Sequence, residues 1–172
     1  MIYITTSRKP SVLSRRLVKQ LARMLRAESE NRGKRSVAET LERAQAKGYT
    51  RCMLVYEEHG NPSKLSFLEK GEWLPSISIK NASFAVGEEK ERRRLPGLWK
   101  IHAKDAVGEQ IAALFETPQA SEKMGETLGG VEMHASSSEI SFSFEGKKVG
   151  PTIKVRGIEQ PQKIDSETEV EE

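Results

Sequence analysis

The residues of this chain best suited to chemistry are cations, and they are concentrated near its N-terminal end. Residues 1–36 contain ten lysines and arginines but only two acids, which gives the segment a net charge of +8. Such side chains bind phosphate, and an arginine guanidinium also stacks on nucleic-acid bases. The basic block therefore predicts a polyanionic partner, with a solvated surface helix as the alternative. The ten cations are Arg8, Lys9, Arg15, Arg16, Lys19, Arg23, Arg26, Arg32, Lys34 and Arg35.

A helix from about Pro10 to Ala27 is predicted to position most of these cations. Its apolar residues fall on one stripe that faces a core, and its cations lie about 180° away. Ser7 or Lys9 is expected near the helix cap, and Arg8 and Lys9 then lie where free backbone N–H groups also bind phosphate. The stripe consists of Leu13, Leu17, Val18, Leu21, Met24 and Leu25, and the opposite face consists of Arg15, Arg16, Lys19, Arg23 and Arg26.

A basic loop at residues 31–35 follows the helix and extends the predicted binding surface. Ser36 and Glu39 then form a capping box that opens a second helix to about Lys47, and Gly48 ends it. The hydroxyl groups of Ser7 and Ser11 add two further polar contacts to the predicted polyanion-binding set. That set is Ser7, Arg8, Lys9, Ser11, Arg15, Arg16, Lys19, Arg23, Arg26, Arg32, Lys34 and Arg35.

The remaining pattern predicts an α+β protein in which one order of elements occurs twice. Each half contains a strand, a long helix, a short helix and three strands, which indicates an internal duplication. Hairpins at residues 57–62 and 145–151 are assigned equivalent positions in the two halves, and the second is expected to contain turns at residues 145–148 and at Gly150 and Pro151. The predicted strands are Ile2–Thr6, Arg51–Glu58, Lys64–Glu69, Leu74–Lys80, Leu98–Ala103, Val131–Ala135, Glu139–Phe144 and Thr152–Ile158, and the helices of the second half are Asp105–Phe115 and Ala120–Leu128.

Length and charge predict one domain followed by a tail. The domain covers residues 1–158, with halves at about 1–86 and 98–158 and a charged connector at 87–97. Residues 92–94 of the connector are interpreted as solvated arginines, with RNA contact as the alternative. Residues 159–172 carry six acids and one lysine, a net charge of −5, and are predicted to be a disordered acidic tail.

Composition excludes several classes of protein. No apolar run approaches the roughly 20 residues of a membrane span, and the N-terminus lacks the pattern of a secretory signal. With a single cysteine, these features predict a cytoplasmic protein without disulfides. The chain has no nucleotide-binding glycine loop, nucleophile elbow or paired-carboxylate pattern, so we expect no enzyme, cofactor or small-molecule substrate.

The weaker candidates for functional residues are interpreted as structural residues. His59 with Glu57 has the residue types of a metal site, but two ligands are too few and a hairpin-tip histidine is favoured. Cys52 lies in an apolar run and is interpreted as a core thiol. Trp73, Trp99 and Phe84 are interpreted as packing residues, with base stacking as the alternative.

Four motifs in their order along the chain resemble the Brix-domain family. The opening signature is Thr5-Thr6-Ser7-Arg8-Lys9-Pro10-Ser11, and the basic helix follows it. Further matches are Asn31-Arg32-Gly33, the strand and turn at residues 54–62, and the closing segment at residues 149–155. The resemblance covers roughly residues 1–158 and is nearest to short archaeal members related to a eukaryotic small-subunit processome protein.

The resemblance implies a ribosome biogenesis factor that binds ribosomal RNA or its precursor and assists rRNA processing and subunit assembly. It also implies two pseudo-symmetric αβ halves, each similar to the anticodon-binding domain of class II aminoacyl-tRNA synthetases. Other ribosome-assembly proteins are the further partners that it suggests. The alternative that follows from this fold is a tRNA or anticodon-type RNA-recognition accessory module.

Overall fold

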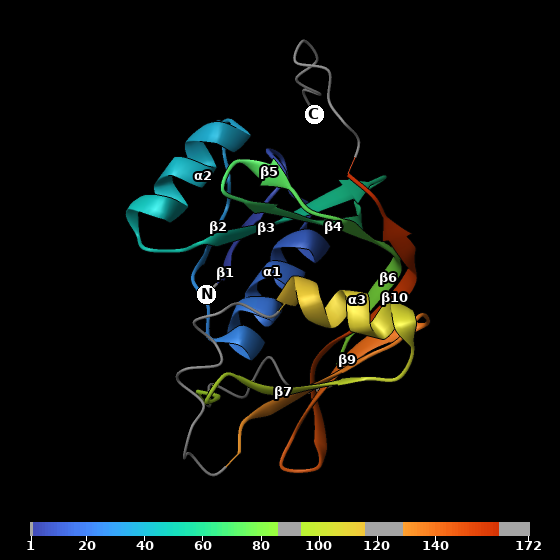
Figure 1. The fold of residues 1–172 in the computed structure, drawn as a ribbon. Coiled ribbons are helices and arrows are strands. Elements are labelled where there is room, and N and C mark those ends of the chain that lie inside the picture. Colours follow the sequence, from blue (N-terminus) through green and yellow to red (C-terminus); the bar gives the residue numbers. More distant parts are fainter. Residues whose placement is uncertain (1, 86–93, 116–128, 162–172) are drawn as a thin grey trace.

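The computed structural model describes residues 2–85, 94–115 and 129–161, which form one ten-stranded sheet and three helices (Figure 1). The elements are β1 (Ile2–Thr6), α1 (Val12–Leu25), β2 (Ser29–Glu30), α2 (Val37–Ala46), β3 (Arg51–Glu58), β4 (Asn61–Glu69), β5 (Glu72–Trp73), β6 (Ser76–Phe84), β7 (Leu98–Ala103), α3 (Ala106–Phe115), β8 (Val131–Ala135), β9 (Glu139–Phe144) and β10 (Lys147–Glu159).

The sheet runs in the order β2-β1-β3-β4-β6-β10-β9-β8-β7, with β5 paired to β4 outside this path. Parallel pairs lie toward its two ends, because β1 pairs in parallel with β2 and β3, and β7 pairs in parallel with β8. The neighbours between them are antiparallel, and β6 pairs with β10 at the junction of the two halves. One continuous sheet therefore connects the N-terminal and C-terminal parts of the domain.

The helices lie on both faces of this sheet. Figure 1 shows the sheet curling around α1 and α3, whereas α2 lies on the opposite side of β1 and β3. Alternate strand residues face the two sides. Ile4 and Met53 join the large core with α1 and α3, while Tyr3 and Cys52 join a smaller core under α2. None of the helices within the described residues is long and apolar enough to cross a membrane.

Most elements agree with the sequence prediction, including the bounds of β1, β3, β7, β8 and β9. The cap of α1 is Ser11, two residues after Lys9, which was expected near the cap. The predicted capping box of Ser36 and Glu39 is confirmed at the start of α2. Strands β2 and β5 were not predicted, because each has two residues and is too short to show a periodic pattern.

The predicted turn at Gly150 and Pro151 was wrong. Strand β10 continues through both residues. The turn predicted at residues 145–148 is confirmed, because the chain turns at Glu145 and Gly146, whose φ angles are 53° and 78°. Positive φ at both central residues is typical of a two-residue hairpin turn. Gly150 has a φ of 65° at an irregularity in the β9–β10 register, so the glycine allows the strand to bend without ending.

The two hairpins assigned equivalent positions differ in the strand order. The first joins β3 to β4, and β3 is the strand paired in parallel with β1. The second joins β9 to β10, neither of which belongs to a parallel pair. The predicted short helix Ala120–Leu128, residues 87–93 of the connector and residues 162–172 of the tail lie outside the described residues.

Candidate nucleic-acid interface

The N-terminus of α1 is held by a carboxylate from the neighbouring strand. The Ser11 backbone N–H donates to Glu57 Oε2 at 2.9 Å, and the Ser14 hydroxyl donates to the same oxygen at 2.6 Å. The Ser11 hydroxyl accepts from the Ser14 N–H at 3.2 Å and so caps the helix. Because Glu57 supplies negative charge at the helix N-terminus, a protein group already lies where the sequence suggested a phosphate.

These contacts also lower the pKa of the Glu57 carboxyl group. Partial burial raises the pKa of a carboxyl group, but hydrogen bonds from Ser14 and Ser11 outweigh it and lower the pKa of Glu57. Ser7 is buried and its N–H donates to the Val55 carbonyl at 3.1 Å. The Ser11 hydroxyl therefore has a structural role as the helix cap, and Ser7 is held in the core by its backbone. At the same end of the helix, Arg8 is half-buried and Lys9 is exposed.

The cations of α1 differ in how much solvent they meet. Arg15, Lys19 and Arg26 are exposed, whereas Arg16 and Arg23 are half-buried. The Arg16 guanidinium lies 4.2 Å from the centre of the Phe84 ring on β6, a cation–π contact. Sequence periodicity therefore found the correct face of the helix but treated all five cations as equally solvated.

One residue of the predicted apolar stripe lies on the surface. Leu13 is 40% exposed and Val12 is 70% exposed, while Ser14 is buried. Ser14 takes the buried position because its hydroxyl bonds Glu57 across the helix–sheet interface. The rest of the stripe, from Leu17 to Met24, packs in the large core as predicted. The exposed surface of α1 thus combines apolar side chains at its start with cations along its length.

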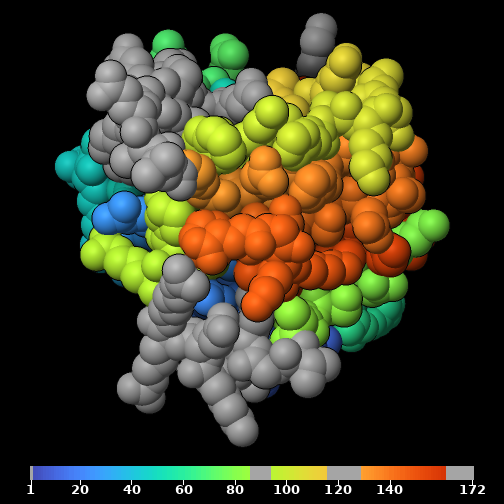
Figure 2. All heavy atoms as spheres, turned by 90° about the horizontal axis from the view of Figure 1, so that it is seen from below, coloured from blue at the N-terminus to red at the C-terminus, as the bar shows by residue number. Residues whose placement is uncertain are grey.

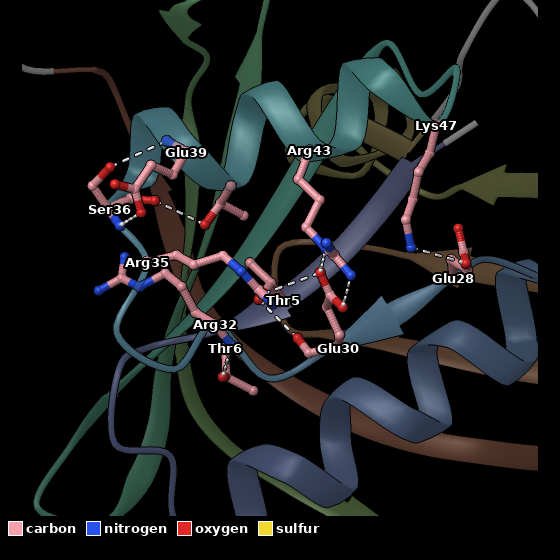
Figure 3. A network of polar contacts seen from close by, with 11 residues as sticks. Thr5, Thr6, Glu28, Glu30, Arg32, Arg35, Ser36, Glu39, Arg43 and Lys47 are labelled. Carbon is pink, nitrogen blue, oxygen red and sulfur yellow. Dashed lines mark hydrogen bonds and ion pairs between the residues drawn. The ribbon is translucent and has the colours of Figure 1, made fainter.

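The cations of the loop at residues 31–35 lie beside an internal network of polar contacts (Figure 3). Glu30 accepts from Arg43 Nε, from Arg43 Nη2 at 3.2 Å and from Arg35 Nη1 at 3.2 Å. Burial raises the pKa of Glu30, but the hydrogen bond from Arg43 and the charge of Arg35 lower it overall. Sequence analysis did not single out Glu30 or Arg43, because they are 13 residues apart and on different elements.

The three predicted binding residues of this loop therefore have different surroundings. Arg32 is only 4% exposed, and its backbone N–H donates to Thr6 Oγ1 at 3.2 Å. Arg35 pairs with Glu30, and Lys34 is exposed. Lys34 is thus the loop cation whose side chain is most open to solvent.

A shallow hollow of about 360 Å³ lies at the C-terminal end of α1. Arg23, Arg26 and Arg94 contribute to its lining together with Tyr49 and Glu28. Arg94 was assigned to the solvated connector, and the fold brings it to the end of the basic helix. The Arg94 guanidinium therefore joins those of Arg23 and Arg26 and extends the basic surface beyond the helix.

We call the exposed or half-exposed basic surface of Arg15, Lys19, Arg23, Arg26 and Arg94 the α1 basic stripe. From Arg15 to Arg26 it extends about 16 Å along the helix axis, at about 1.5 Å per residue. Phosphates along one strand of a duplex are spaced by about 3.4 Å, so the stripe matches about five of them. This arrangement is suited to binding a polyanion by its backbone.

Within the described parts of the chain, His59 belongs to no cluster of metal-ligating side chains. No group of three or more histidine, cysteine, aspartate or glutamate residues is arranged there to hold a metal ion. Glu57 points toward α1, where it bonds Ser11 and Ser14. His59 occupies the hairpin turn with a φ of 50°.

Comparison with known proteins identifies the family. No family model matches the chain. A protein of Methanosarcina mazei named "Probable Brix domain-containing ribosomal biogenesis protein" is 30% identical over 150 residues, which cover 85% of this chain and 92% of that protein. The chain belongs to the Brix domain family. The family resemblance inferred from the sequence motifs is confirmed.

Other similar proteins also match this Brix chain over most of its length. A protein of the same name from Methanothermobacter thermautotrophicus is 28% identical over 141 residues, which cover 82% of this chain and 77% of that protein. The crystal structure of a probable ribosomal biogenesis protein from Aeropyrum pernix has a TM-score of 0.72 and 26% identity, covering 93% of this chain and 96% of that one. An archaeal Imp4-like protein shares the fold with a TM-score of 0.65 and 23% identity, covering 92% of this chain and 99% of that one.

Proposed function

We propose that this Brix chain is a ribosome biogenesis factor that binds ribosomal RNA or its precursor through the α1 basic stripe. In this role it assists rRNA processing and subunit assembly by binding, without catalysing a reaction itself. Relatives from two archaea carry the name of ribosomal biogenesis proteins, which supports the process. The α1 basic stripe supports RNA as the ligand, because RNA is the phosphate-rich polyanion present during ribosome assembly.

The observation that carries the proposal is the fixed position of cations on a well-anchored helix. Glu57 holds the start of α1, and the half-buried Arg16 contacts Phe84 on β6. Leu17 and Leu21 are fully buried beneath it. A helix that is rigid before binding loses little further conformational entropy when RNA binds, so more of the electrostatic free energy appears as affinity.

The proposal extends to the organisation of the domain. We regard residues 1–86 and 98–158 as related halves joined by the connector, followed by an acidic tail. The tail was predicted to begin at residue 159, but β10 includes Glu159, so the tail begins after it. The strand order supports this, because each half runs from a parallel pair (β1–β3 or β7–β8) through an antiparallel neighbour to the central β6–β10 pair. Similarity of each half to an anticodon-binding domain stays a prediction.

Charge reversal on the stripe tests the proposed function. The variant Arg15→Glu, Lys19→Glu and Arg26→Glu is expected to lose binding to a structured ribosomal RNA fragment in a fluorescence anisotropy titration. All three side chains are exposed, so the thermal unfolding midpoint should change little. For the wild type, the slope of log affinity against log salt should lie between about −3 and −6, for five to seven phosphates engaged.

A matched control carries the same charge change elsewhere on the protein. The variant Lys64→Glu, Lys70→Glu and Lys80→Glu alters exposed or half-exposed lysines of the first half outside α1. It should keep most of the wild-type affinity. Equal losses in the two variants would mean that charge acts diffusely, and a salt slope near zero would reject the phosphate contact altogether. A transfer RNA bound more tightly than the ribosomal fragment would favour the anticodon-type alternative.

A further inference from the structure

The second half of the sheet has an open polar face on the side away from α3. Helix α3 packs against β7 and β8 on the inner side, together with the core residues Val131, Met133 and Ala135. The residues between them on β8, Glu132 and His134, therefore point outward. Figure 2 shows the molecule from the side on which residues of β7, β8, β9 and β10 lie together at the surface.

Two histidines stack on this face. His102 on β7 and His134 on β8 are register partners, and their ring centres lie 4.9 Å apart with planes inclined by only 9°. His102 Nε2 lies 3.2 Å from Glu132 Oε1, and His134 Nε2 lies 3.0 Å from Ser143 Oγ. These contacts hold both rings parallel and in a fixed orientation.

The stack is accessible because β7 is the last strand of the sheet order within the described residues. The His102 side chain is 37% exposed, and His134 stacks on one side of its ring. Trp99, on the same strand, is 41% exposed. A flat group can therefore continue the stack from the edge of the sheet.

Lysines surround the stacked pair. The pKa of Glu139 is lowered chiefly by its hydrogen bond and charge interaction with Lys154, and the charges of Lys148 and Lys104 add to this effect. Lys100 lies opposite Glu132 in the β7–β8 register. Four lysines thus accompany two carboxylates, a net charge of +2 with neutral histidines. The charge of this face is complementary to an anionic partner.

We infer that this face is a second RNA-contact surface, at which an unpaired base stacks on His102 and His134 while neighbouring lysines hold the adjoining phosphates. The inference rests on the proposed function in taking RNA as the ligand. Single-stranded RNA is recognised by aromatic platforms beside cations, which matches this combination. A protein partner is disfavoured because the outward residues of β8 and β9 are polar.

The experiment compares two probes that differ only in their bases. One is a short single-stranded RNA oligonucleotide of mixed sequence, and the other has the same sugar–phosphate backbone without bases. The variant His102→Ala with His134→Ala is expected to bind the first probe at least about fivefold more weakly, the loss of about one base–aromatic stack. Its affinity for the abasic probe should equal that of the wild type, because the lysines are intact.

Two further variants separate stacking from other effects of the substitution. The variant His102→Phe with His134→Phe keeps two flat rings and should retain base-dependent binding. The variant His59→Asn changes a histidine at an exposed hairpin turn, where asparagine also tolerates the positive φ, and should bind both probes like the wild type. Circular dichroism melting of each variant shows whether the fold is intact.

The outcomes distinguish this inference from the proposed function. Charge reversal on the α1 basic stripe should weaken both probes, whereas the histidine variant should weaken only the probe with bases. If the stripe variant loses binding and the folded histidine variant does not, the proposed function stands and the second surface is rejected. If the histidine variant loses both probes equally, base stacking is rejected. Unchanged binding by the stripe variant would instead reject the proposed function.

Discussion

Arg51 on β3 donates a hydrogen bond of 2.7 Å to the carbonyl oxygen of Leu114 near the C-terminal end of α3. The same nitrogen lies 3.0 Å from the Ala113 carbonyl, and Nη2 donates to Glu69 Oε2 at 3.2 Å. The last carbonyls of a helix lack partners within it, and the helix dipole is negative at that end. A cation of the first half therefore stabilises a helix of the second half, which adds a polar link to the shared sheet.

Removing this link should destabilise the whole domain. In Arg51→Met the side chain keeps most of its apolar length but loses every hydrogen bond. The carbonyls of Ala113 and Leu114 and the carboxylate of Glu69 then lose the donor that Arg51 supplies. We expect a loss of about 3 kcal/mol in the free energy of unfolding, measured by urea denaturation. Arg156→Met on the exposed side of β10 is the control and should cost less than about 0.5 kcal/mol. Equal midpoints for the two variants would show that the link is energetically neutral.

Gly150 is expected to tolerate no side chain, for two separate reasons. Its φ of 65° disfavours other residues, and an added Cβ would lie 2.6 Å from Met24 Sδ and 2.9 Å from Met24 Cγ. Gly150→Ala should therefore cost about 3 kcal/mol, combining backbone strain with overpacking. Gly146→Ala has a similar φ of 78° but nothing within 4 Å, so it should cost about 1 kcal/mol. A cost no larger than that of Gly146→Ala would show that Met24 moves aside freely.

Glu57 should make folding stability depend on pH. Its pKa is lowered in the folded protein from 4.5, so the unfolded chain binds a proton more readily. The stabilisation is therefore present above about pH 4.5 and is lost as pH falls through the lower folded pKa. Glu57→Gln should cost about 1 kcal/mol at neutral pH, a value that allows for solvent screening. The difference from wild type should shrink in acid-side urea titrations. The control Glu58→Gln, at an exposed neighbouring position, should cost less than about 0.5 kcal/mol at neutral pH.

Cys52 should be chemically inert while the protein is folded. The thiol is only 1% exposed, and burial raises its pKa to about 12. The thiolate is the reactive form, so almost none is present at mildly alkaline pH. A coloured thiol reagent should react with Cys52 only after denaturant is added. Rapid reaction in native buffer would mean that the smaller core under α2 opens readily.

Neighbouring arginines on α1 should respond differently to the same substitution. Arg16→Glu removes the contact with Phe84 and should lower the free energy of unfolding by about 1 kcal/mol. Arg15→Glu changes an exposed side chain and should alter stability by less than about 0.5 kcal/mol. Thermal or urea unfolding of the two variants gives the comparison. If they are equally stable, Arg16 is a solvated cation like Arg15.

Local patterns in the sequence were sufficient to predict most of the helices and strands. The apolar spacing of residues 17–24 identifies the buried side of α1, because a helix repeats every 3.6 residues whatever surrounds it. The capping box of Ser36 and Glu39 joins residues three positions apart. A run of β-branched and aromatic residues likewise placed β1, and an apolar run placed β3. Where the backbone bends through an irregular contact, as at Gly150, the same local patterns predicted a turn that the tertiary structure replaces with a strand.

The sequence by itself determined that a helix presents cations on the side opposite a core, and its ordered motifs identified the Brix family. Only the tertiary structure decided which cations remain open to solvent. Arg16 meets Phe84 from β6, Arg35 shares Glu30 with Arg43, and the α1 N-terminus meets Glu57, 43 residues beyond Ser14. The stacked histidines are likewise brought together by strand pairing. Contacts between distant residues depend on how elements pack, and helical or strand periodicity contains no record of that packing.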